Sequence, residues 1–338
     1  RLFARISVAS MTTASSSTGQ EVGTSWTKSV SDKGEYVRKA SQFRSWISND
    51  KSSNFAAESG RYHLYVCFAC PWAHRALIVR ELKGLTDAIT VNVVDWHLKP
   101  GGWRFSPDKP GCTADDVNGF NTLREVYTSV DPAYSANITV PVLYDKKKRT
   151  IVSNESAEII IMLNSAFNCV CGRADLDLYP EEFRAEIDSV NEFVYNNVNN
   201  GVYRAGFATA QEPYDEAVTK LFNALDDLEN RLSTRRYLVG SPKSRLTLAD
   251  VRLFTTLIRF DWVYHQHFKC NLRQLVDYPN LWAFTRDIYQ LPGVSGTVNK
   301  EHIRKHYMMS HTQINPHGIV PIGPQLDLDK PHDREKLP

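Results

Sequence analysis

A cysteine followed by a proline separates a predicted strand from a predicted helix. Residues 62–66, Tyr-His-Leu-Tyr-Val, have the composition and alternation of a strand, and residues 73–82 carry apolar side chains at helical spacing. Cys70 and Pro71 come between them, where proline suits the first turn of a helix, and Gly84 then ends the helix. The sequence therefore predicts a strand that delivers Cys70 to a helix N-terminus.

Later segments complete a small α/β domain around this unit. We expect further strands at residues 89–94, 139–144 and 151–152, and a helix from residue 157 to about residue 163. Residues 97–135 are predicted to form a long polar loop, a kind of segment that is uncommon unless it is functional. The order of these elements predicts an α/β domain over residues 60–165.

The second half of the chain has helical periodicity. Apolar residues between 218 and 232 share one helical face, and a further helix covers residues 280–290. Thr247 and Asp250 have capping-box spacing, so we assign Asp250 to helix capping and not to catalysis. We expect an all-helical domain over 175–310, an extended C-terminal tail over 311–338 and an irregular N-terminal extension over 1–59.

Composition argues against several kinds of partner. The net charge of +2 does not suggest a dedicated nucleic-acid surface, and no apolar run is long enough for a membrane-spanning helix. Six cysteines in 338 residues are too few for a disulfide scaffold and fit a reducing compartment. Residues 1–20 have the composition of a transit-peptide remnant or of a disordered tail. We expect a cytoplasmic protein, or a plastid or mitochondrial one if that remnant is genuine.

Cys70 is the candidate nucleophile. Backbone N–H groups and the helix dipole favour a thiolate at this position, and the thiolate is the reactive form. Cys67 completes a C-x-x-C spacing, but the partner of a dithiol nucleophile would lie three residues after Cys70, where the chain has Ala73. We therefore predict a monothiol enzyme. The alternatives are a buried structural Cys70 and a regulatory Cys67–Cys70 bridge.

Two later segments fit a peptide-like ligand. A cis bond before Pro141 would turn the backbone N–H and C=O of Val140 toward the site, although an ordinary trans proline at a strand start is the alternative. Glu155 and Ser156 open a helix, where a hydroxyl and free N–H groups bind a carboxylate and Glu155 can hold an ammonium group. The γ-glutamyl end of glutathione offers both groups.

Several motifs resemble those of the glutathionyl-hydroquinone reductases, also called xi-class glutathione transferases. The motifs are Cys-Pro-Trp-Ala-His-Arg at 70–75, Val-Pro-Val-Leu at 140–143, Ser-Asn-Glu-Ser-Ala-Glu-Ile-Ile at 153–160 and Asn-Asn-Gly-Val-Tyr-Arg-Ala-Gly-Phe-Ala at 199–208, with shorter matches at 259–261, 267–270 and 315–318. The resemblance spans about residues 40–330. It implies a thioredoxin-like N-terminal domain, an all-α C-terminal domain and a homodimer.

The resemblance also implies roles for single residues. Cys70 resembles the family nucleophile, Trp103 the tryptophan that packs on glutathione, and Val140 the backbone clamp, while Glu155 and Ser156 resemble the γ-glutamyl binders. The tyrosines that resemble those around the aromatic substrate are Tyr195, Tyr203, Tyr307 and, less closely, Tyr264, of which we expect Tyr195 and Tyr307 to be catalytic. Asn137 stands where the family often has arginine, and Arg124 could compensate.

These residues predict a glutathione-dependent reductase of aromatic quinol conjugates. The Cys70 thiolate would attack the thioether sulfur of a glutathionyl-hydroquinone, with tyrosine assisting proton transfer, and a second glutathione would release oxidised glutathione from the mixed disulfide. The alternatives are a glutaredoxin-like or dehydroascorbate-reducing thiol transferase and a noncatalytic transferase-like interaction module. His265, His267 and Cys270 fit no standard zinc spacing, so no metal is expected.

Overall fold

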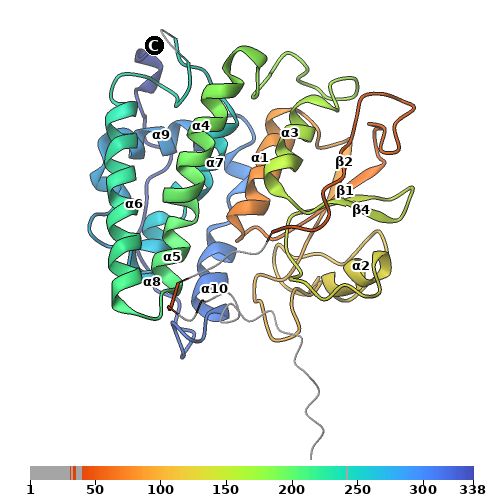
Figure 1. Ribbon diagram of the computed structural model, residues 1–338, viewed down its shortest axis with the longest axis horizontal. Helices are drawn as coiled ribbons and strands as arrows, with labels where there is room; N and C mark the ends of the chain where they lie inside the picture. The colour runs from red at the N-terminus through yellow and green to blue at the C-terminus, as the bar shows by residue number, and fades with distance from the viewer. Residues whose placement is uncertain (1–30, 32, 36–39, 241–242) are drawn as a thin grey trace, which may run out of the picture.

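The computed structural model describes residue 31 and residues 33–35, 40–240 and 243–338. The expected transit-peptide remnant therefore lies outside the described residues. Figure 1 shows a sheet with its flanking helices on one side and a group of helices on the other. The predicted combination of a thioredoxin-like α/β domain and an all-helical domain is confirmed.

The sheet has four strands in the order β2-β1-β3-β4. The strands are β1 (Tyr62–Val66), β2 (Ile89–Val93), β3 (Val142–Asp145) and β4 (Thr150–Ser153). β1 pairs in parallel with β2 and antiparallel with β3, and β3 pairs antiparallel with β4. β3 begins at Val142, later than expected, because Pro141 has no N–H to give to the sheet.

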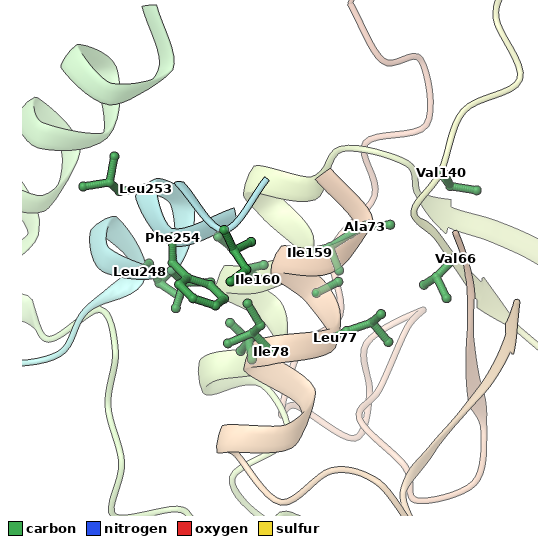
Figure 2. Packing of buried hydrophobic residues seen from close by; sticks show 14 of the residues in the cluster. Val66, Ala73, Leu77, Ile78, Val140, Ile159, Ile160, Leu248, Leu253 and Phe254 are labelled. Atoms are coloured by element: carbon green, nitrogen blue, oxygen red, sulfur yellow. The ribbon is translucent and has the colours of Figure 1, made fainter. Parts of the chain in front are cut away.

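Helix α1 (Pro71–Leu82) lies between the sheet and the helical half, beside α3 (Ser156–Ser165). Figure 2 shows Leu77 of α1 near Val66 on the sheet side, and Ile78 near Phe254 of α7 (Leu248–Leu257) on the other side. Burying an aliphatic side chain of this size contributes about 1.5–3 kcal/mol. Packing on both sides of α1 thus fixes the helix that follows Cys70.

The helical half is built on α-helices joined by turns and loops. The main helices are α4 (Arg184–Val194), α5 (Gly201–Phe207), α6 (Gln211–Leu232), α7, α9 (Pro279–Gln290) and α10 (Lys300–Ser310). The shorter pieces are α8 (His265–His267), the π-helical turns η3 (Tyr195–Asn199) and η4 (Phe260–Tyr264), and the 3₁₀ turns η2 (Glu181–Phe183), η5 (Leu275–Asp277), η6 (Ser295–Thr297) and η7 (Arg334–Lys336). Among the described residues, no helix has both the length and the apolar character needed to cross a bilayer.

One prediction was wrong, because the expected loop at 97–135 contains helix α2 (Leu123–Val130). The Glu125 N–H donates to the Thr122 hydroxyl, and the Glu125 carboxylate accepts from the Thr122 N–H, which forms a capping box. The Thr-x-x-Glu signal was present in the sequence. The predicted cap at Thr247 and Asp250 is confirmed.

Candidate active site

Cys70 is the N-cap residue of α1, and its side chain is partly exposed. The thiol donates a hydrogen bond of 3.6 Å to the backbone oxygen of Val140. Val140 lies just before β3, which flanks β1 on the side opposite to β2. The Val140–Pro141 peptide bond is cis, as the sequence analysis considered. The fold therefore brings together two of the predicted site residues that are seventy positions apart in the chain.

Cys67 differs from Cys70 in its surroundings. It lies at the end of β1 with no exposed surface, and burial raises the pKa of its thiol well above the ordinary value. None of the six cysteines of the chain, all of them described, forms a disulfide bond. A buried neutral thiol is a poor nucleophile, which favours the monothiol interpretation.

Glu155 and Ser156 form the start of α3. Glu155 is the N-cap residue, and its Oε1 accepts a 3.0 Å hydrogen bond from the Ala157 N–H. Its Oε2 accepts a 3.0 Å bond from the Ser41 hydroxyl, a contact that the sequence analysis missed. Ser156 is buried, and its hydroxyl lies 3.5 Å from a guanidinium nitrogen of Arg75.

Residues 41–45, here called the N-terminal strap, run antiparallel along the outer edge of β4. The Ser45 N–H donates to the Val152 oxygen, and the Asn154 N–H donates to the Phe43 oxygen, at 2.9 and 3.1 Å. Arg44 of the strap also forms an ion pair with Glu158. The strap thereby holds Ser41 against the Glu155 carboxylate.

Trp103 is buried in the loop before α2. Its ring stacks on that of His306 with centroids 5.4 Å apart, and His306 donates from Nδ1 to the Trp96 oxygen at 2.7 Å. Helix α10, which carries His306, thus fixes the tryptophan from the helical half. His306 was not among the predicted residues, although it directly precedes Tyr307.

Arg124 lies in the first turn of α2. Its charge acts on the hydroxyl of Tyr134, and that hydroxyl donates a 3.0 Å hydrogen bond to the Asn137 oxygen. Arg124 and Asn137 are therefore neighbours of one tyrosine. This arrangement is compatible with the idea that Arg124 takes the place of a family arginine at position 137.

Three of the four predicted tyrosines form one hydrogen-bonded group. Tyr307 lies between the others, with its hydroxyl 2.6 Å from that of Tyr203 and 3.0 Å from that of Tyr264. They come from α10, α5 and η4, and all are buried. Burial raises the pKa of Tyr203 and Tyr307 well above the ordinary value and that of Tyr264 to about 12. All three phenols are therefore protonated donors near neutral pH.

Tyr195 lies apart from that group, at the start of η3. Its ring meets the edge of Trp72 at 6.0 Å, while Trp72 stacks on Tyr203 at 6.2 Å. Tyr195 also lines a cavity of about 470 Å³ together with Asn200, Arg204 and other residues of η3, α5 and α6. Trp72 thus separates Tyr195 from the three hydrogen-bonded tyrosines. Tyr195 and Tyr264 both lie in π-helical turns, η3 and η4, and such turns often occur at functional sites.

No group of three or more histidine, cysteine or carboxylate side chains suited to a metal ion occurs within residues 31, 33–35, 40–240 and 243–338. His267 lies 3.1 Å from His311 through their ring nitrogens. The Cys270 thiol contacts the Phe268 oxygen at 3.8 Å.

Buried neutral histidines predict a loss of stability in mild acid. Burial lowers the pKa of His63, His267 and His306 from 6.5 to about 4. Between these values the unfolded chain binds protons that the folded protein does not, so the folded state is most stable above pH 6.5 and loses stability as the pH falls toward 4. Each of these histidines accounts for a loss of unfolding free energy on the order of 3 kcal/mol by about pH 4. Asp250, whose pKa burial raises to about 6, and Asp261, whose pKa burial also raises, oppose the trend.

Urea denaturation across this pH range measures the effect. We expect the urea midpoint to fall steadily below pH 6.5. Burial also lowers the pKa of His74 and His311 well below the ordinary value, so His63→Gln, which lies outside the candidate site, should make the slope shallower by about a fifth or less. A midpoint that stayed constant down to pH 4 would contradict the assignment of neutral histidines.

Comparison with known proteins identifies the class that this fold defines. The family model described as glutathione S-transferase, N-terminal domain, matches residues 69–166, and the corresponding C-terminal domain model matches residues 211–287. A thioredoxin-like domain followed by these helices is thus the architecture of glutathione transferases.

Sequence relatives show which family of glutathione transferases the chain resembles. The chain is 52% identical over 316 residues to glutathionyl-hydroquinone reductase YqjG of Escherichia coli, covering 92% of this chain and 95% of the relative. It is 50% identical over 303 residues to glutathionyl-hydroquinone reductase PcpF of Sphingobium chlorophenolicum, covering 90% and 94%. The chain belongs to the glutathionyl-hydroquinone reductase family of Xi-class glutathione transferases.

Solved structures agree with this assignment. The glutathione-bound structure of YqjG has a TM-score of 0.83 at 52% identity, covering 87% of this chain and 96% of that one. The glutathione S-transferase Xi of Phanerochaete chrysosporium has a TM-score of 0.84 at 51% identity, covering 87% and 94%. The predicted family is therefore confirmed.

Proposed function

We propose that this chain reduces glutathionyl-hydroquinones to hydroquinones with glutathione, through a mixed disulfide on Cys70. One arrangement carries the proposal: a partly exposed thiol at the head of α1 is close enough to the buried phenol of Tyr203 for its charge to act on that phenol. Burial raises the pKa of that phenol, and the charge of Cys70 raises it further. The relatives YqjG and PcpF carry the name of this activity.

Glutathione binding is assigned to the sheet side of the site. The backbone of Val140 would pair with the cysteinyl part of glutathione, next to the Cys70 thiol. Glu155 would hold the ammonium group and Ser156 the carboxylate of the γ-glutamyl end, at the N-terminus of α3. Trp103 would pack on the peptide, and Arg124 would attract its glycine carboxylate.

In the first step the Cys70 thiolate attacks the glutathionyl sulfur of the substrate. A sulfur–sulfur bond forms, the bond between that sulfur and the ring carbon breaks, and the electron pair of the broken bond goes to the ring. The ring carbon then takes a proton, which gives the hydroquinone. We assign the donation of hydrogen bonds to the ring hydroxyls to Tyr307, with Tyr203 and Tyr264 as its partners.

In the second step another glutathione thiolate attacks the glutathionyl sulfur of the mixed disulfide. Oxidised glutathione leaves, and Cys70 returns as a thiolate. Tyr195 is assigned to the outer part of the aromatic site, where it would contact the ring substituents from beside Trp72. The scheme needs no resolving cysteine, in agreement with Ala73 at the third position after Cys70.

Intact mass spectrometry tests the proposal. After incubation with a glutathionyl-hydroquinone and no free glutathione, one glutathione adduct should form, and peptide mapping should assign it to Cys70. Rates on that substrate and on a glutathione mixed-disulfide model compound separate hydroquinone release from a glutaredoxin-like activity. Turnover of the mixed disulfide alone would reject the proposal in favour of the thiol transferase.

The strap adds a prediction about glutathione affinity. Ser41→Ala removes a hydroxyl that donates to Glu155 Oε2, so this carboxylate loses part of its orientation. We expect the KM for glutathione to rise by about threefold to tenfold, with kcat little changed, since one hydrogen bond to a charged group contributes about 1 kcal/mol or slightly more. Steady-state kinetics measure both constants.

Ser52→Ala is the matched control, because Ser52 is exposed and, among the described residues, its hydroxyl hydrogen-bonds only to Asp50. It should leave both constants unchanged. Equal KM values for the two serine variants would exclude a role of Ser41 in glutathione binding.

The family resemblance implies an oligomeric state. We propose a homodimer, and light scattering of the purified protein measures its mass directly. A mass of one chain would reject it.

A further inference from the structure

A buried arginine binds the loop that presents Cys70. Arg259, the residue before η4, has no exposed surface. Its Nε donates to the Ala69 oxygen at 2.9 Å, and one terminal nitrogen donates to the Phe68 oxygen at 3.0 Å. The other terminal nitrogen donates to the Thr255 oxygen at 2.7 Å and to Nδ1 of His74 at 3.0 Å. The guanidinium of the helical half therefore binds the two carbonyl groups that directly precede Cys70.

The charge of Arg259 has no carboxylate partner among the described residues. Within the part of the chain that the structure describes, no aspartate or glutamate oxygen lies within 4.0 Å of its guanidinium. A buried charge without a counter-charge is costly, even where its N–H groups are hydrogen-bonded. A negative charge close to Arg259 would relieve this cost, and the adjacent group that can ionise is the thiol of Cys70.

We propose that Arg259 is a positioning residue of the reaction, which holds the Cys70 loop by its carbonyl groups and supplies the buried positive charge that stabilises the Cys70 thiolate. The proposal rests on the proposed function only in taking Cys70 as the nucleophile.

His74 extends the contact to the tyrosines. Burial lowers its pKa well below the ordinary value, so the ring is neutral, and Nδ1 accepts from Arg259. Nε2 therefore carries the proton and donates to the Thr297 hydroxyl at 2.8 Å, and Thr297 donates to the Val294 oxygen at 2.6 Å. Thr297 lies in η6, shortly before α10 and Tyr307. Arg259 and His74 thus link the cysteine loop to the segment that leads into the tyrosine helix.

Other titratable groups around Cys70 do not replace this charge. Burial keeps Cys67, the three hydrogen-bonded tyrosines and His306 neutral near neutral pH. Arg75 is the neighbouring buried guanidinium on α1, and it is directed at Asn199, to which it donates at 2.6 Å, and at the Trp72 ring. Glu155, at the N-cap of α3, is the nearby carboxylate assigned to ligand binding.

The pH dependence of Cys70 alkylation tests the proposal. Wild type, Arg259→Gln and Arg259→Lys are treated with iodoacetamide over a range of pH, and mass spectrometry follows the peptide that contains Cys70. Arg259→Gln should raise the apparent pKa of Cys70 by about 1 to 2. Arg259→Lys keeps the positive charge but cannot donate to both the Ala69 and Phe68 oxygens with a planar guanidinium. It should therefore raise the Cys70 pKa by less than half as much as Arg259→Gln does, while lowering kcat.

Arg334→Gln is the matched control. Arg334 is a buried arginine whose guanidinium donates to the backbone oxygens of Leu232 and Arg236 at the end of α6, in another part of the helical half. Its loss should lower stability and leave the pKa of Cys70 unchanged. Equal Cys70 pKa values in Arg259→Gln and Arg334→Gln would overturn the proposal.

Two further outcomes separate the possible failures. If Arg259→Gln does not fold, the test of the proposal rests on Arg259→Lys. A wild-type kcat together with a wild-type Cys70 pKa in that variant would overturn the positioning role. If wild type forms no adduct with a glutathionyl-hydroquinone while Arg259→Gln still raises the Cys70 pKa, the proposed function fails and the electrostatic role of Arg259 is supported.

Discussion

Cys70→Ser should lower the turnover of a glutathionyl-hydroquinone by about a thousandfold or more. A serine hydroxyl at the head of α1 stays protonated near neutral pH, and oxygen cannot form the disulfide on which the second step depends. Neither half-reaction can then proceed through a mixed disulfide, while Val140 and Glu155, the proposed glutathione contacts, are unchanged. Initial rates of hydroquinone release measure the effect, and glutathione binding by calorimetry checks that the site is intact.

Cys67→Ala is the control for that experiment. Cys67 is fully buried, and burial raises the pKa of its thiol, so its removal should affect stability slightly and turnover by less than about twofold. A Cys70→Ser variant with turnover within about tenfold of wild type would refute the covalent mechanism. An equal loss in Cys67→Ala would instead point to a dithiol mechanism.

Gly206→Ala should destabilise the protein by about 3 kcal/mol or more. A Cβ at this position of α5 would lie 2.1 Å from Cγ and 2.2 Å from Cδ1 of Phe268. Phe268 is fully buried and packs on Tyr264 and Tyr307 with ring centroids 5.5 and 5.6 Å apart, so its displacement would disturb both rings. Urea denaturation gives the free energy of unfolding.

Gly296→Ala is the matched control, because a Cβ there would meet no atom within 4 Å. It should change the unfolding free energy by less than about 0.5 kcal/mol. If Gly206→Ala matched it, Phe268 would have to be far more mobile than its packing indicates. The expected movement of Phe268 in Gly206→Ala would also displace Tyr264 and Tyr307, so a loss of kcat should accompany the loss of stability.

Local patterns were enough to predict the elements that present Cys70. The strand before it, Pro71 at the first helical position and the apolar face of α1 all depend on neighbours within a few residues. Helix α2 was missed because its apolar positions are few, although its capping box could have indicated it. A capping box indicates where a helix begins, but the polar composition of the segment argued more strongly for a loop.

The partners of the site residues could not be predicted in the same way. Ser41 reaches Glu155 across 114 residues, and Arg259 reaches Ala69 across 190, so neither contact leaves a periodic trace in the sequence. The family motifs supplied four candidate tyrosines without their geometry. Only the packing of α5, η4 and α10 separates the three hydrogen-bonded tyrosines from Tyr195.

The N-terminal strap has a consequence for the solubility of the folded chain. β4 is the last strand of the sheet order, and an uncovered outer strand offers its free N–H and C=O groups to other chains, which promotes aggregation. Residues 41–45 occupy part of that edge through the bonds to Val152 and Asn154. The same five residues hold Ser41 against Glu155. Removal of residues up to 45 would therefore expose this edge of β4 and, at the same time, remove the hydroxyl that orients the Glu155 carboxylate.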